Sequence, residues 1–290
     1  MNVKRFIPKR LKIFLKSWYS NLIPEEKYLN RSFTITIPRI DFQLTKAQNE
    51  ELLKQTSQVW EKLGAEEPHW SVLTNSKFMK KNLDKNRSEF NKTGYSSTKQ
   101  ILGALNQIGI PLQSLNELTV LEIGSGVGRV TIPLSKIFKK IIATDVSLQH
   151  LSILEKEIEE GEINNILINQ ITKLDDFGIH KNYSGIYSVI TLQHNPPPIQ
   201  LAILEIVLRN LQPGGFFFFQ TPTYIPNYEF NIVKYLKSSG SQMEMHPVPM
   251  PEVFELLLKN DCGIKLTLRD DWTGREYDSH TFIGVKNIAK

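Results

Sequence analysis

Apolar residues follow two alternating patterns along most of the chain. Short apolar runs, typical of buried strands, occur near residues 118–123, 141–145, 166–170, 185–191, 215–221, 263–270 and 280–286. Apolar residues recur at helical spacing near 129–138, 147–160, 197–211 and 251–260. Strands that alternate with helices are typical of a parallel sheet. The pattern therefore predicts an α/β fold, with a seven-stranded, mostly parallel sheet and helices on both of its faces.

The first third of the chain has a mainly helical pattern. Residues 41–63 predict one long helix ending at Gly64, and its buried face holds Leu52, Leu53, Val59, Trp60 and Leu63. Residues 90–105 predict a helix that leads into the sheet, with Gly94 and Tyr95 at the edge of a binding site. The loop between them contains Pro68, His69 and Trp70. We divide the chain into an N-terminal basic and helical extension or lid, residues 1–94, and a sheet domain, residues 95–290.

The most informative segment joins the first predicted strand to the next helix. Residues 120–128 read Val-Leu-Glu-Ile-Gly-Ser-Gly-Val-Gly. Because glycine has no Cβ, this turn lets the backbone come close to a ligand. Arg129 stands where a dinucleotide-binding turn would have glycine or alanine. The turn therefore predicts a nucleotide-like cofactor other than a dinucleotide.

Two carboxylates accompany this turn. Asp145 ends the second predicted strand, where an acid can accept hydrogen bonds from both hydroxyls of a ribose. Glu122, inside the first strand, suits a cofactor with a cationic amino group. With these residues in this order, residues 95 to 287 resemble the class I S-adenosylmethionine-dependent methyltransferases. The resemblance implies a Rossmann-like fold, S-adenosyl-L-methionine as the cofactor and methyl transfer as the reaction.

The resemblance also implies roles for individual residues. The glycine turn would wrap the methionine part of the cofactor, and Asp145 would hold the ribose. Many members carry an aspartate after the third strand that contacts the adenine amine, whereas residues 169–176 here read Asn-Gln-Ile-Thr-Lys-Leu-Asp-Asp. Ile171 and Thr172 then become the adenine neighbours by position. The predicted cofactor-binding residues are Glu122, Gly124, Ser125, Gly126, Gly128, Asp145, Val146, Ile171, Thr172 and Gln193.

A histidine after the fourth predicted strand is the candidate catalytic residue. Gln193, His194 and Asn195 precede three prolines, which fix the backbone and present these side chains stiffly. A histidine can take a proton from a hydroxyl, because its unperturbed pKa lies near neutrality. We therefore interpret His194 as a general base. The alternative is that His194 and Asn195 cap the next helix and brace the loop.

The residues near this strand end favour a polar acceptor. The loops that carry Tyr224, His246 and Trp272 suit a hydroxylated ligand such as a sugar. Asn195-Pro196-Pro197 lacks the following aromatic of many nucleic-acid amino-methylating enzymes, and the basic residues do not interleave with aromatics. We therefore predict O-methylation of a small molecule or a glycan. The alternatives are a non-catalytic S-adenosylmethionine-binding protein, or a methyltransferase acting on a protein or nucleic acid.

Cysteine usage limits the other classes of chemistry. Cys262 is the single cysteine, which precludes an internal disulfide and any multi-cysteine metal site. The remaining histidines and acids show no metal-ligand spacing, so we predict no metal. A reducing compartment is the expectation, and we predict a cytoplasmic protein. The sequence gives no indication of an oligomeric state.

Residues 1–20 hold six lysines and arginines and no acid, within a formal net charge of +5. Leu11, Phe14, Leu15 and Trp18 fall on one face at helical spacing. Such a helix suits peripheral contact with the anionic inner face of a membrane. The alternative, which we favour, is packing on the body of the protein with a solvated basic face. The pattern leaves both interpretations open.

Overall fold

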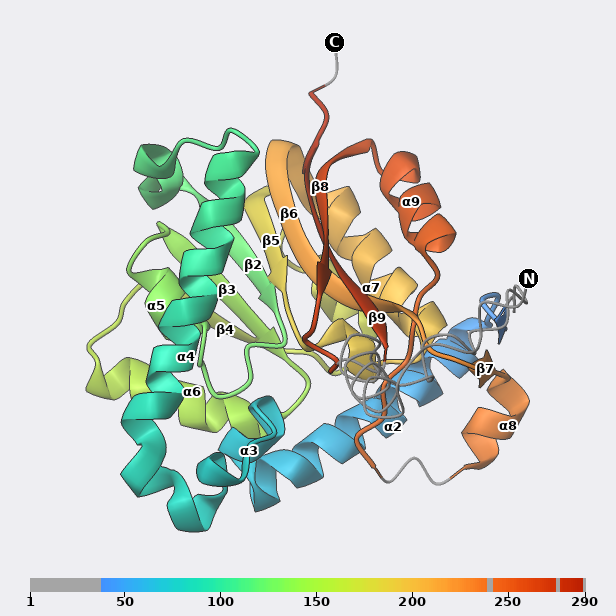
Figure 1. The fold of residues 1–290 in the computed structure, drawn as a ribbon, viewed down its shortest axis with the longest axis horizontal. Coiled ribbons are helices and arrows are strands. Elements are labelled where there is room, and N and C mark those ends of the chain that lie inside the picture. The colour runs from blue at the N-terminus through green and yellow to red at the C-terminus, as the bar shows by residue number, and fades with distance from the viewer. Residues whose placement is uncertain (1–37, 239–241, 275–276, 289–290) are drawn as a thin grey trace, which may run out of the picture. The chain divides into compact units, whose positions relative to one another are not determined.

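The computed structural model describes residues 38–238, 242–274 and 277–288, so the predicted basic helix of residues 1–20 lies outside the described residues. Its main sheet has seven strands in the order β4-β3-β2-β5-β6-β9-β8 (Figure 1). Neighbouring strands are parallel except for β9, which is antiparallel to β6 and to β8. The strands are β2 (Thr119–Ile123), β3 (Lys140–Asp145), β4 (Ile166–Gln170), β5 (Tyr183–Ser188), β6 (Leu211–Tyr224), β8 (Cys262–Asp270) and β9 (Asp278–Lys286). The predicted fold class is confirmed.

The central strands are apolar because both of their faces are covered. On one face lie α4 (Lys80–Gln107), α5 (Thr131–Ser135) and α6 (Leu148–Glu160), which share a core with Val120 and Ile141. On the other face lie α7 (Pro197–Asn210) and α9 (Met250–Lys259), which share a core with Leu121 and Phe217. The helix predicted at residues 129–138 is shorter than expected, since α5 ends at Ser135.

Helix α2 (Lys46–Glu66) crosses the edge of the sheet where the strands end (Figure 1). It contacts α6 on one face and α7 on the other, and α3 (Pro68–Val72) follows it directly. The predicted start at Asp41 is wrong, because Thr45 caps the helix by accepting a hydrogen bond from the Gln48 backbone. The predicted stop at Gly64 is also wrong, since this residue is buried within the helix against Ser147.

A small two-stranded sheet ties the segment before α2 to the segment after β6. In it, β1 (Arg39–Ile40) pairs with β7 (Glu229–Phe230) in parallel. The Asp41 carboxylate accepts hydrogen bonds from the backbone N–H of Ile232 at 3.0 Å and from the Asn231 side chain at 3.1 Å. These contacts lie at the start of α8 (Ile232–Lys237). The long connection between β6 and α9 is therefore anchored to the chain just before α2.

Arg39–Lys290 forms one compact unit, and the boundary proposed at residue 94 lies inside α4. Gly94 and Tyr95, expected at an edge of the site, lie elsewhere. Gly94 packs against the Arg129 backbone carbonyl, and Tyr95 is exposed and lies beside the Lys136 ammonium.

Within the described residues, every helix is too short or too polar to cross a membrane.

Two glycines of α4 provide a matched test of this packing. A Cβ at Gly94 would overlap the Arg129 carbonyl, whereas a Cβ at the exposed Gly103 would meet no atom within 4 Å. We expect Gly94→Ala to lower the free energy of unfolding by about 1–3 kcal/mol through overpacking. Gly103→Ala should raise it by about 0.5–1 kcal/mol, because alanine favours a helix. Urea unfolding of both variants measures the difference, and equal effects would contradict the close packing of α4 on Arg129.

Candidate functional site

A cleft of about 860 Å³ lies at the carboxyl ends of β2, β3 and β5. This is the position where open α/β sheets bind ligands. Of the predicted cofactor residues, those that line the cleft are Glu122, Gly124, Ser125, Gly126, Asp145, Val146 and Ile171. Gly128, Thr172 and Gln193 do not line it.

In the part of the chain that the structure describes, no three His, Cys, Asp or Glu side chains are grouped to hold a metal ion.

The glycine turn has a backbone that other residues rarely adopt. The φ angles of Gly124, Gly126 and Gly128 are 77°, 54° and 87°, in the left-handed region. A Cβ on Gly126 would lie 2.7 Å from a methyl of Val72 in α3, and one on Gly128 would lie 2.5 Å from a methyl of Leu154 in α6. Gly126 therefore permits the lid to approach the turn, whereas Gly128 permits the packing of α6.

The Asp145 carboxylate fixes the turn relative to α6. Its Oδ2 accepts a hydrogen bond from the backbone N–H of Gly126 at 2.8 Å, and its Oδ1 accepts one from Ser147 at 2.9 Å. Each carboxylate oxygen has two lone pairs, so each can accept a further hydrogen bond. Asp145 is thus positioned by the backbone and remains able to bind two hydroxyl groups of a ligand.

Glu122 is a buried carboxyl group with an open acceptor. Its exposure is 2 %, and its Oε2 has no hydrogen-bond partner among the described residues. Burial raises its pKa to about 7, although Arg129 beside it acts in the opposite direction. The Ser125 hydroxyl is also buried without a partner. A ligand that carries an amino group fits these two open positions.

Part of the cleft lining is apolar and belongs to the hydrophobic core on the α7 face. Val146, Ile171, Phe177 and Ile203 form this part, which suits a flat ring system. Thr172 does not face this region, because its backbone N–H and its hydroxyl donate to the Asp176 carboxylate at 2.8 and 2.7 Å. The Thr172 side chain is therefore already hydrogen-bonded to Asp176, and it does not line the cleft.

The lid helices supply the roof of the cleft, and its residues are Thr56 and Trp60 of α2 and Ser71 and Val72 of α3. The sequence indicated a lid but singled out His69 and Trp70. His69 is buried and packs edge-on against Phe90, with ring centroids 5.1 Å apart. Neither His69 nor Trp70 lines the cleft. The sequence placed Trp60 on the buried face of a helix, but it did not show that Trp60 borders the cleft.

His150 is a cleft residue that the sequence analysis missed. The Ser71 hydroxyl donates to the Pro68 carbonyl, so it accepts from His150 Nε2, which lies 2.9 Å away. His150 Nδ1 is then an acceptor, and it is buried without a partner among the described residues. Burial lowers the His150 pKa, which favours the neutral ring. His150 therefore lines the cleft and carries a buried acceptor that no described residue satisfies.

The end of β5 is held in a strained conformation. Ile190 has a φ of 59°, which is rare for a β-branched residue and costs about 1–3 kcal/mol. Its N–H donates to the Gln220 side-chain oxygen at 2.9 Å, and the Gln220 side-chain nitrogen donates to Gln193 Oε1 at 3.0 Å. The strand predicted to reach residue 191 ends at Ser188 for this reason. Ile190, Thr191 and Asn195 line the cleft, while Gln193 is buried behind it.

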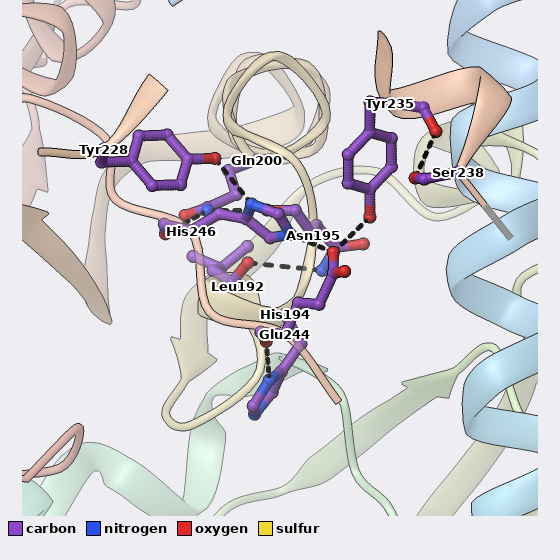
Figure 2. A network of polar contacts seen from close by, with 9 residues as sticks. All are labelled: Leu192, His194, Asn195, Gln200, Tyr228, Tyr235, Ser238, Glu244 and His246. Atoms are coloured by element: carbon purple, nitrogen blue, oxygen red, sulfur yellow. Dashed lines mark hydrogen bonds and ion pairs between the residues drawn. The ribbon is translucent and has the colours of Figure 1, made fainter. Parts of the chain in front are cut away.

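His194 lies beside the cleft and lines a smaller adjoining pocket. Its Nδ1 is 2.7 Å from the Glu244 backbone carbonyl, so Nδ1 carries the proton and Nε2 the lone pair (Figure 2). The Gln193 amide nitrogen is 3.3 Å from Nε2, and the Trp60 ring centroid is 4.9 Å from the imidazole. Burial lowers the His194 pKa to about 4. The ring is therefore neutral at neutral pH.

The loop residues expected around the acceptor are dispersed. His246 is buried behind Glu244, and its Nδ1 lies 2.6 Å from the Tyr228 hydroxyl (Figure 2). Tyr224 lies at the exposed end of β6, and Trp272 packs against the core on the α4 face. None of these three residues lines the cleft or the smaller pocket. Glu244 lines the pocket in their place.

The raised pKa of Glu122 predicts how stability depends on pH. The unfolded carboxyl titrates near 4.5 and the folded one near 7, so the folded protein binds more protons between these values. Stability should therefore fall as pH rises through this range, by on the order of 3 kcal/mol from this group. Glu122→Gln should remove that part of the slope. Urea unfolding without ligand from pH 5 to 8 compares the two proteins, and identical slopes would contradict the assignment.

Comparison with known proteins agrees with this geometry. Residues 120–215 match the family model described as a methyltransferase domain. No curated protein matches the chain. Magnesium protoporphyrin IX methyltransferase from Synechocystis PCC 6803, solved with bound S-adenosylhomocysteine, has 16% sequence identity and a TM-score of 0.55. The match covers 82% of this chain and 100% of that one.

Two further structures give the same result. The Synechocystis enzyme solved with bound S-adenosylmethionine has 14% identity and a TM-score of 0.54, over 85% of this chain and 100% of that one. Phosphoethanolamine N-methyltransferase 2 from Haemonchus contortus has 13% identity and a TM-score of 0.51, over 66% and 53%. Similarity at these identities establishes the fold. Residues 120–215 are therefore similar to a methyltransferase domain, and the chain has the fold of the class I S-adenosylmethionine-dependent methyltransferases.

Proposed function

We propose that the cleft binds S-adenosylmethionine and that the protein transfers its methyl group to a hydroxyl of a small molecule or a sugar. The observation that carries the cofactor assignment is the buried, unpartnered Oε2 of Glu122 beside the glycine turn. An α-amino group satisfies that acceptor. Asp145 would hold the ribose hydroxyls, and Val146, Ile171 and Phe177 would surround the adenine.

His150 adds a contact that the fold alone does not imply. The residue lines the cleft, its Nδ1 is a neutral acceptor that no described residue satisfies, and its Nε2 is bound to Ser71 in the lid. We assign it a hydrogen bond from a donor on the nucleoside. The contact links the occupancy of the cleft to the position of α3. It would also supply a polar contact to the nucleoside, which the Thr172 side chain does not offer because it is hydrogen-bonded to Asp176.

The chain's own residues can position an acceptor and remove its proton. When bound, S-adenosylmethionine supplies a methyl group that an acceptor oxygen takes, while the electrons of the carbon–sulfur bond return to sulfur. The roof formed by α2 and α3 would keep water from the reacting groups. His194 Nε2 would exchange its contact with the Gln193 side-chain amide for the acceptor hydroxyl and take the hydroxyl proton, because the Glu244 carbonyl holds the other proton on Nδ1. Positioning supplies much of the acceleration of such a displacement.

Calorimetric titration tests the cofactor assignment. Asp145→Ala should weaken S-adenosylhomocysteine binding by about ten- to hundred-fold, because a charged acceptor for the ribose is lost. Asp175→Ala removes the same charge at an exposed position outside the cleft and should leave the affinity unchanged. His150→Leu should weaken binding by about ten-fold. The absence of any heat with S-adenosylmethionine or S-adenosylhomocysteine would refute the cofactor.

Kinetics test the role of His194. Incubation with labelled cofactor and extract of the source cell, followed by mass spectrometry, identifies the acceptor. With that acceptor, His194→Ala should lower kcat by about 10²–10⁴ and leave S-adenosylhomocysteine affinity nearly unchanged. The wild-type rate should be level at neutral pH and fall as pH drops through about 4, where the base becomes protonated. An unchanged rate in the variant would leave His194 with a bracing role alone.

A further inference from the structure

The connection between β6 and α9 is fastened to the loop that carries His194. The His246 backbone N–H donates to the Gln193 carbonyl at 2.8 Å, and the Gln200 side-chain amide donates to the His246 carbonyl at 2.8 Å. Two residues earlier, the Glu244 backbone carbonyl accepts the hydrogen bond from His194 Nδ1 (Figure 2). Among the described residues, no other hydrogen bond reaches the Glu244 backbone. The position of this carbonyl therefore depends on how the Glu244 side chain is held.

Two neighbours hold the Glu244 side chain. Its Oε2 accepts a hydrogen bond from the Tyr235 hydroxyl at 2.8 Å and lies 3.2 Å from His246 Nε2 (Figure 2). Burial raises the pKa of Tyr235, so its hydroxyl keeps its proton and remains a donor. The His246 contact holds the pKa of the Glu244 carboxyl below its usual range, although burial opposes it. Glu244 is therefore an oriented anion at neutral pH.

His246 is itself fixed by its surroundings. Its ring packs edge-on against the rings of Tyr228, Phe230 and Tyr235, with centroids 5.9, 6.3 and 5.7 Å away. The Tyr228 hydroxyl lies 2.6 Å from His246 Nδ1, and burial raises the pKa of Tyr228, so this hydroxyl is a donor. In the neutral imidazole, the ring proton then lies on Nε2, which faces the Glu244 carboxylate. Tyr228, His246 and Glu244 therefore form one chain of polar contacts.

The two ring nitrogens of His194 have different partners. Nδ1 lies 2.7 Å from the Glu244 carbonyl, and the Gln193 side-chain amide lies 3.3 Å from Nε2. Because a carbonyl only accepts hydrogen bonds, this contact requires the proton on Nδ1, and its loss would let the proton move to Nε2. A proton on Nε2 leaves no lone pair there to take the proton of an acceptor hydroxyl. The position of one backbone carbonyl thus favours the tautomer in which His194 can act as a base.

We propose that Glu244 is a positioning residue whose side chain, held by Tyr235 and His246, directs its own backbone carbonyl at His194 Nδ1. The inference rests on the proposed methyl transfer with His194 as its base. Glu244 does not line the cleft, so it acts through His194 and not on the reacting groups. The connection after β6 thereby completes a site whose other parts belong to the sheet and the lid.

The variants Glu244→Ala and Glu244→Gln test this role, because neither removes the backbone carbonyl. Long-range ¹H–¹⁵N NMR of the histidine-labelled full chain without ligand reports which His194 nitrogen carries the proton, and the spectrum of His194→Ala assigns its signals. We expect one tautomer in the wild type, with the proton on Nδ1, and both tautomers in Glu244→Ala. Glu244→Gln should keep the Nδ1 tautomer, since its amide oxygen still accepts from Tyr235.

Two tyrosine variants form a matched pair for the same measurement. Tyr235→Phe removes the hydroxyl that donates to Glu244, so the tautomers should mix as they do in Glu244→Ala. Tyr224→Phe removes a hydroxyl at the exposed end of β6 and should leave the wild-type tautomer. The Glu244 side chain is 40% exposed, so we expect its variants to fold, and thermal unfolding checks this for each protein.

Kinetics with the identified acceptor measure the consequence for the reaction. Glu244→Ala should lower kcat about three- to ten-fold, the effect of one hydrogen bond, and leave KM and S-adenosylhomocysteine affinity unchanged. Glu244→Gln should restore most of the rate.

The outcomes separate this proposal from the proposed function. A single Nδ1 tautomer in Glu244→Ala, an equal change in Tyr224→Phe, or an unchanged kcat in Glu244→Ala where His194→Ala is impaired would each overturn the positioning role. The tautomer is measured without cofactor or acceptor. Failure to bind S-adenosylhomocysteine, or an unimpaired His194→Ala, would instead count against the proposed function.

Discussion

The site depends on two hydrogen bonds to one carboxylate. Asp145 accepts from the backbone of Gly126 in the turn after β2 and from that of Ser147 at the start of α6. These bonds hold two loops from neighbouring strands at a fixed separation, and the left-handed glycines let the turn fit. Glu122 and Ser125 are then buried with open polar atoms. The position of the carboxylate thus fixes the turn that carries Ser125.

The floor of the cleft belongs to the sheet, but its roof does not. Helix α2 crosses the carboxyl edge and reaches helices on both faces, so it braces the two layers against each other. Through Trp60 it borders the cleft and the smaller pocket at once. Through Ser71, the following helix is bonded to His150 beside Asp145. The lid is therefore integrated with the loops that line the cleft and is not an independent domain.

Local sequence was sufficient for the sheet and for the floor of the cleft. Apolar runs located the strands, and the spacing of the glycines and two acids identified residues that now line the cleft. It was insufficient wherever a residue's role depends on a partner distant in the chain. In the sequence, His150 is one position of an amphipathic helix, and its contact with Ser71 is apparent only in the structure. Gln193 was predicted to line the cleft, but its hydrogen bond with Gln220 holds it behind the cleft. Thr172 was likewise turned away by Asp176, four residues later.

The pairing of β1 with β7 has a consequence for how such a protein could diversify. The walls of the smaller pocket come mainly from α2 and from the connection after β6. Strand β1 lies just before α2, and strand β7 lies within that connection, so their parallel pairing joins the two segments. Neither segment contributes a residue to the glycine turn. A chimera that exchanged both segments as a unit would therefore change the walls of the smaller pocket on an unaltered floor, whereas exchanging one alone would break a strand pair and the Asp41 cap of α8.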